Sequence, residues 1–99
     1  MRRGTTPTHS FVLPFNVESV QAVQVIYRQN DQNILILEKD DCTLSGNSVS
    51  VRLTQEDTFD FDDGANVEIQ IRVVTADGEA MASDAIQVSC DRCLTEDIL

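Results

Sequence analysis

The three cysteines have the widest chemical repertoire in this chain. Cys90 and Cys93 enclose two residues, a spacing shared by many zinc and thiol redox sites, and Cys42 with His9 would complete four zinc ligands. Zinc modules usually carry two such pairs, and a redox pair usually opens a helix in an α/β fold. We therefore expect reduced thiols, with Cys90 as a small buried hydrophobe and Cys93 packed where the last strand ends. Zinc at the cysteines is the alternative.

Four aspartates ahead of Gly64 form the densest group of carboxylates: Asp57, Asp60, Asp62 and Asp63. Several oxygens from one turn suit Ca²⁺, but the spacing lacks the third oxygen ligand before the glycine and the distal glutamate of an EF-hand loop. Aspartate is also common in turns for backbone reasons. The group is predicted to be an acidic turn, with calcium as the alternative.

His9 is the one histidine and lies in a segment expected to be peripheral. A catalytic Cys–His pair can be drawn between His9 and any cysteine, yet no sequence feature brings such a pair together. The sequence contains no Gly-rich phosphate loop, nucleophile elbow or HExxH motif. We therefore predict a non-enzymatic protein with no catalytic residue and no cofactor.

Charge is strongly unbalanced, with 17 carboxylates against 7 Lys and Arg and a formal net charge of −10. Such a surface repels phosphate backbones and anionic membranes, so neither nucleic acid nor a membrane is an expected partner. Arg2 and Arg3 stand apart from the acidic body, and residues 1–8 are predicted to be a flexible basic arm. The arm is either a solvated, frayed terminus or a segment that docks onto an acidic neighbouring subunit.

Length and hydropathy favour one small domain that spans residues 1–99. No apolar run has the length of a membrane helix, and the polar start lacks the hydrophobic region of a secretory signal. We expect the chain to be made in a cytoplasm.

Alternation of apolar and polar residues predicts the elements that must position these side chains. The strongest pattern runs from Val67 to Val73 and predicts the central strand. Other strands are expected at Phe11–Phe15, Val20–Arg28, Ile34–Leu37, Leu44–Ser45, Ser48–Leu53 and Ala85–Val88, with turns at 30–33, 46–47 and 77–78. Pro14 places the first strand at a sheet edge. The apolar run Ile34–Leu37 does not alternate, which indicates a strand covered on both faces or one whose outer face meets a partner.

Thr54 and Asp57 have the spacing of a capping box, which predicts one helical turn near residues 54–58. Such a turn between two strands suits a crossing from one sheet to another, with Phe59 and Phe61 closing the core beneath it. Six or seven strands without a long helix predict an all-β, antiparallel β-sandwich.

The chain also resembles a family of small phage and prophage proteins of Gram-positive gut bacteria. The resemblance is carried by Met1–His9, Phe11–Phe15, Asp41–Asn47, Leu53–Thr58, Val67–Val73, Ala82–Asp84 and Val88–Leu94. The layout is more loosely similar to the N-terminal domain of phage baseplate upper proteins. The resemblance implies an immunoglobulin-like sandwich that acts in or beside a virion, and it transfers no catalytic residue.

Together these features lead us to expect a structural or assembly protein of a phage tail or baseplate, with other virion proteins or a second copy as partners. Its edge strands could pair between subunits. Predicted contact residues are Arg2, Arg3, Ile34, Ile36, Ile98 and Leu99, although the tail 94–99 could instead pack on its own sheet. The alternatives are a metal-dependent binding module and an inhibitor of a host protein.

Overall fold

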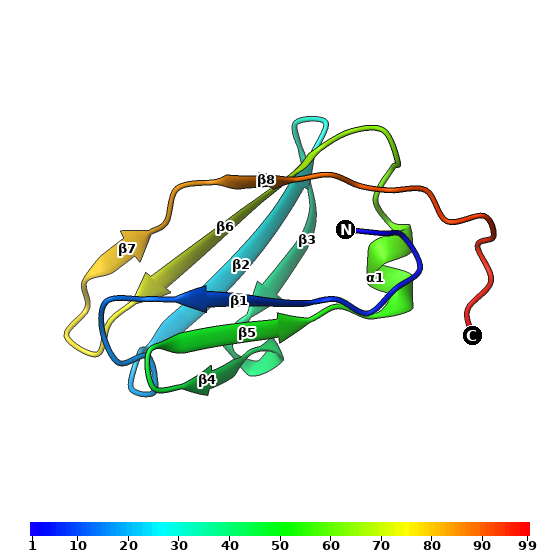
Figure 1. The fold of residues 1–99 in the computed structure, drawn as a ribbon. Coiled ribbons are helices and arrows are strands. Elements are labelled where there is room, and N and C mark those ends of the chain that lie inside the picture. The colour runs from blue at the N-terminus through cyan, green and yellow to red at the C-terminus, as the bar shows by residue number, and fades with distance from the viewer.

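Two antiparallel sheets pack face to face in the computed structural model, which describes residues 1–99 (Figure 1). The smaller sheet has the order β1-β5-β4, and the larger has the order β3-β2-β6-β7, with β8 also paired to β6. The elements are β1 Thr8–Val12, β2 Ala22–Gln29, β3 Gln32–Glu38, the 3₁₀ turn η1 Lys39–Asp41, β4 Thr43–Ser45, β5 Ser48–Arg52, α1 Gln55–Phe59, β6 Val67–Val74, β7 Ala80–Ala82 and β8 Ile86–Val88. The predicted antiparallel β-sandwich is confirmed. Neither helical segment could cross a membrane.

Strand order matches the immunoglobulin pattern. Hairpins β2–β3, β4–β5 and β6–β7 alternate with three crossings between the sheets. In immunoglobulin letters, β1, β5 and β4 occupy the places of B, E and D, while β3, β2, β6 and the β7–β8 edge occupy those of C′, C, F and G. No strand lies beside β1 at the place of strand A, so β1 is an edge strand.

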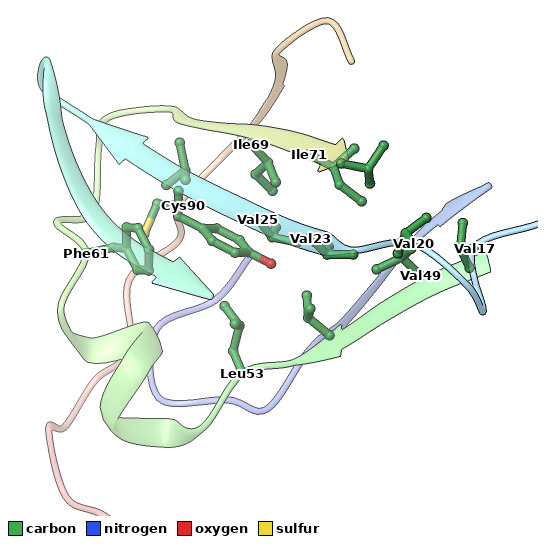
Figure 2. Close-up of a cluster of buried hydrophobic side chains, with 14 residues drawn as sticks. Val17, Val20, Val23, Val25, Val49, Leu53, Phe61, Ile69, Ile71 and Cys90 are labelled. Carbon is green, nitrogen blue, oxygen red and sulfur yellow. The ribbon is translucent and has the colours of Figure 1, made fainter. Parts of the chain in front are cut away.

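The core lies between the sheets and follows the predicted alternation. Its buried side chains come from both layers: Val23, Val25 and Tyr27 of β2, Val67, Ile69, Ile71 and Val73 of β6, Val49 and Val51 of β5, and Leu53. Figure 2 shows Phe61 and Cys90 at one end of this row and Val17 and Val20 at the other. The predicted inward faces of β2, β5 and β6 are therefore confirmed.

The first strand begins and ends earlier than the predicted Phe11–Phe15, because the chain leaves the sheet before Pro14. Its predicted position at an edge is confirmed. The sandwich also has eight strands where six or seven were expected. The Ala-Met-Ala sequence of β7 carries no alternating pattern, and it becomes a strand because β6 offers a free edge. Ser83 separates β7 from β8 and bonds to both backbone groups of Ile71.

The apolar run in β3 is explained by an irregular register. Tyr27 faces Leu35 whereas the next residue, Arg28, faces Asn33, so Ile34 is an extra residue on β3. Such a bulge interrupts the alternation of side chains. Ile34, Leu35 and Leu37 pack against the core, and Ile36 faces outward at 43% exposure. Coverage on both faces is therefore not the reason for the run.

The predicted capping box and sheet crossing are confirmed at α1. The Thr54 hydroxyl accepts a hydrogen bond from Asp57 N, and the Asp57 carboxylate accepts one from Thr54 N. The helical turn links β5 of the smaller sheet to β6 of the larger one. Phe61 is fully buried, as expected, whereas Phe59 is half-buried and packs against Gly4.

The start of the chain is docked, which corrects the expectation of a flexible arm over residues 1–8. Arg3 N donates to Asp91 O at 3.0 Å, and Asp91 N donates to Met1 O at 2.8 Å. Arg2 and Asp91 form a parallel bridge, and Thr8 already belongs to β1. The backbone near Asp91 therefore supplies hydrogen-bond partners for this segment.

Candidate interaction surface

All three cysteines are free, and the structure contains no disulfide. Cys90 is buried in the core as predicted, and Cys93 is half-buried in the segment after β8. Burial raises the pKa of both Cys90 and Cys42, and the nearby carboxylates of Asp41 and Glu38 also raise the pKa of Cys42. A thiol held in its neutral form is a poor nucleophile and a poor metal ligand.

The acidic turn is held by backbone contacts. The Asp57 carboxylate completes the capping box of α1. Asp62 binds through its main chain, because its N–H donates to the buried Gln29 side chain at 2.7 Å. Asp60 and Asp63 point into solvent. No three Cys, His, Asp or Glu side chains in the structure come close enough to hold a metal ion. The four predicted calcium candidates are therefore not brought together as ligands.

His9 belongs to the inner face of β1, which corrects the expectation of a peripheral position. It is half-buried, and its Nδ1 lies 2.7 Å from the hydroxyl of Tyr27. Burial lowers the pKa of His9, so the imidazole is held neutral. His9 Nδ1 and the Tyr27 hydroxyl share this hydrogen bond, and burial raises the pKa of Tyr27. This arrangement satisfies a core tyrosine and presents no activated nucleophile.

The predicted contact residues lie in different environments in the structure. Arg3 is occupied within the chain: its guanidinium pairs with Glu96 at 2.9 Å, donates to Phe59 O at 3.1 Å and lies over the Phe59 ring. Ile34 is in the bulge and packs on the core. Arg2 is exposed and its guanidinium donates to Arg92 O.

Two apolar residues of the tail, Ile98 and Leu99, remain exposed, and so does Leu94. The tail does not pack on a sheet. The Leu99 backbone exchanges two hydrogen bonds with the Gln55 side chain of α1, at 2.9 and 3.2 Å.

One side of the sandwich, which we call the open side, consists of β1, residues 13–15, β7 and β8 (Figure 1). A groove of about 260 Å³ lies here and is lined by Leu13, Pro14, Phe15, Ile71, Val73, Met81, Ala82 and Ser83. Met81 faces buried Val73 across the strands, yet it remains 40% exposed. Ile86 faces buried Ile69 and is 51% exposed. Inward-facing apolar side chains therefore stay accessible because no strand closes this side.

The outer edge of β1 has free backbone groups. Leu13 N donates to Asn47 O and Leu53 N donates to Pro7 O. These two bonds show which residues of the first strand point their backbone groups toward β5. Odd-numbered residues of β1 bond to β5, since bonding alternates along an antiparallel pair. The N–H and C=O groups of Thr8, Ser10 and Val12 consequently point away from β5, toward the open edge.

Every other edge is shortened or irregular. β4 has three residues, and β7 and β8 have three each with residues 83–85 between them. β3 contains the bulge at Ile34 and ends on Glu38. Bulges, charges and short length are common means of preventing edge-to-edge pairing. β1 has five residues in regular register with no charge and no bulge, so it is the one unprotected edge.

The outer face of the smaller sheet is almost free of charge. We call it the hydroxyl face, formed by Thr8, Ser10, Val12, Thr43, Ser45, Ser48, Ser50 and Arg52. The hydroxyl oxygens of Ser10 and Ser50 lie 2.9 Å apart across the strands. No carboxylate belongs to this face. In the strands as a whole, only Glu38 and Glu68 are acidic, and all other carboxylates lie in connections, helical turns or terminal segments.

Comparison with protein-family models, curated proteins and solved structures finds no match to this chain. Sequence reasoning missed the groove and the hydroxyl face as sites. Their one sequence signal is the run of serines and threonines without acidic residues at 43–50, which gains meaning only from the pairing with β1.

Proposed function

We propose that this chain is a non-enzymatic structural or assembly protein that acts through protein–protein contacts at its open side. The observation that carries the proposal is the unprotected edge of β1 beside an apolar groove. Free backbone groups supply affinity for an added strand, and adjacent apolar side chains supply contact area.

Two further features support contact with protein. The inward-facing Met81 and Ile86 remain exposed at the open side, so burying them against a partner would be favourable. Among the strand residues only Glu38 and Glu68 are acidic, while the other carboxylates occupy connections, helical turns or terminal segments. An acidic periphery around a neutral contact region discourages nucleic acid and anionic membranes as partners.

A phage tail or baseplate is the setting we propose for these contacts. The resemblance to small phage and prophage proteins supports this setting, and so does the immunoglobulin-like strand order, which the resemblance implies. The chain would be made in the bacterial host cytoplasm and would contact other virion proteins during assembly.

The proposal is tested by incorporation into particles from a host that carries the gene. Mass spectrometry of purified particles is expected to find the wild-type chain in the tail or baseplate fraction. The Met81→Lys variant should be incorporated poorly, because it places a charge in the groove. Leu94→Lys is the matched control, since Leu94 is an exposed apolar residue of the terminal segment away from the groove.

Two outcomes would overturn the proposal. Absence of the wild-type chain from particles would remove the virion role. Normal incorporation of Met81→Lys together with loss of Leu94→Lys would move the contact from the open side to the tail.

A further inference from the structure

The edge of β1 can pair with an identical edge. Two antiparallel copies related by a two-fold axis at Ser10 would place Thr8 opposite Val12 and Ser10 opposite Ser10. Thr8, Ser10 and Val12 are the residues whose N–H and C=O groups are free. Each free donor of one strand therefore meets a free acceptor of the other.

We propose that two copies of this chain associate through antiparallel β1–β1 pairing, which joins their smaller sheets into one continuous sheet. This inference rests on the proposed function and names the partner of its open side. It requires no change in the chain, because every backbone group that it uses already faces the edge.

Charge favours a second copy as the occupant. Thr8, His9, Ser10, Phe11 and Val12 carry no carboxylate and no basic side chain, and burial holds His9 neutral. The hydroxyl faces of two copies would meet edge to edge with no acidic side chain on either. This is a surface that two chains of net charge −10 can share without direct like-charge contacts. A basic partner would find no carboxylate to pair with here.

The same charge distribution predicts how association depends on salt. Long-range repulsion between two acidic chains opposes their approach, and salt screens it. The β1 contact itself contains no ion pair for salt to weaken. Association is therefore expected to strengthen as the salt concentration rises, whereas binding of a basic partner at acidic residues would weaken.

The first experiment compares two substitutions at one position by sedimentation equilibrium of the full chain, in low and high salt. Ser10→Pro removes the N–H at the free edge, and proline is tolerated in an edge strand whose N–H faces solvent. Ser10→Ala removes the same hydroxyl but keeps the N–H. We expect Ser10→Pro to weaken dimerisation at least about tenfold relative to Ser10→Ala, because a backbone hydrogen bond is lost on each copy.

A charge exchange tests the two-fold register and does not depend on proline. Ser10→Glu and Ser10→Lys should each be monomeric alone, because like charges would face each other across the axis. An equimolar mixture of the two variants should form a heterodimer. Circular dichroism of each variant checks that its fold is retained. Dimerisation of each charged variant alone, at the wild-type strength, would overturn the register and the proposal.

Failure of this inference is distinguishable from failure of the proposed function. A wild-type chain that stays monomeric at high concentration in high salt overturns β1–β1 pairing. If that monomeric chain is still incorporated into particles, and Met81→Lys is not, the open side contacts a different protein and the proposed function stands.

Discussion

The side chains of this chain that could take part in chemistry serve packing instead. Cys90 fills the end of the core, and the one histidine satisfies the hydroxyl of a fully buried tyrosine. Thr58 is also fully buried. Its hydroxyl lies within hydrogen-bond distance of two carbonyl acceptors, Thr5 O and Gln55 O. Polar groups in such positions need partners, because an unpaired buried donor or acceptor is costly. Their presence is therefore explained by stability.

Gly4 shows how closely the start of the chain is packed. Its φ is +76°, and a Cβ there would stand 2.6 Å from Cζ of Phe59. Gly64 has a φ of +84° with open space around it, so it is a matched control. We expect Gly64→Ala to cost about 1–2 kcal/mol for the left-handed backbone. Gly4→Ala should cost about 1–3 kcal/mol more, because the ring must move.

Urea denaturation of both glycine variants measures the two free energies of unfolding. Equal losses for the two substitutions would contradict the close packing of Gly4 on Phe59.

His9 predicts a pH dependence of stability. Burial lowers its pKa in the folded state, while the unfolded chain has a value of about 6.5. Between these two values the unfolded state binds more protons, so stability falls as the pH falls below about 6.5. The free energy of unfolding of the wild type should therefore drop more between about pH 7.5 and about pH 5.5 than that of His9→Asn.

Thermal melts of the wild type and His9→Asn across this range provide the measurement. Carboxylates are common to both proteins and cancel in the comparison. Parallel pH profiles would show that His9 titrates in the same way in the folded and unfolded states.

At the level of elements, side chains hold the connections in place through hydrogen bonds to backbone groups. Gln29 at the end of β2 is 2% exposed and binds the loop before β6. Its amide donates to Asp62 O at 2.7 Å and Ala65 O at 3.1 Å, and its carbonyl accepts from Asp62 N at 2.7 Å. One side chain thereby fixes the acidic turn to the sheet.

Gln29→Ala should destabilise the chain by about 1–3 kcal/mol, because it leaves partly buried backbone groups of the loop unpaired. Gln24→Ala, at a half-buried position on the outer face of the same strand, should change stability by less than about 0.5 kcal/mol. Urea denaturation measures both, and hydrogen exchange at Asp62 should accelerate only in the Gln29 variant. Equal stabilities of the two variants would contradict the conclusion that the Gln29 side chain holds the loop before β6 in place.

Across the whole molecule, charge is separated by structural role. The sheets are nearly neutral outside, whereas the connection that contains α1 holds Glu56, Asp57, Asp60, Asp62 and Asp63 with no basic residue among them. Like charges gathered in this way oppose the compact state, and salt screens them. The melting temperature at low protein concentration should therefore rise with salt.

Asp60 and Asp77 allow a comparison at equal change of charge. Asp60→Asn should raise the melting temperature in low salt, because Asp60 lies at the C-terminal end of α1 among other carboxylates. Asp77→Asn should lower it, because the Thr75 hydroxyl donates to the Asp77 carboxylate and lowers its pKa. The Asp60 difference should vanish in high salt. Equal shifts for both variants would show that net charge alone decides stability.

Local patterns determined much of the fold. Alternation located β2, β5 and β6 with their inward faces, because a strand places successive side chains on opposite sides. Gly46 and Gly78 marked hairpin turns, and both have positive φ. The capping box at Thr54 also followed from residues three positions apart. Each of these features depends on near neighbours in the chain, so the sequence alone was sufficient.

Tertiary structure alone decided which surfaces remained free. The bulge at Ile34 depends on the register with β2, and docking of Arg3 depends on a segment near residue 91. β1 became an unprotected edge because no strand pairs with its outer side, and the hydroxyl face formed because β1 and β4 flank β5. Pairing between distant segments is set by all the surfaces that compete for burial together, and no local pattern contains that competition. The sequence therefore determined the strands, and only the assembled sandwich decided which of them could meet a partner.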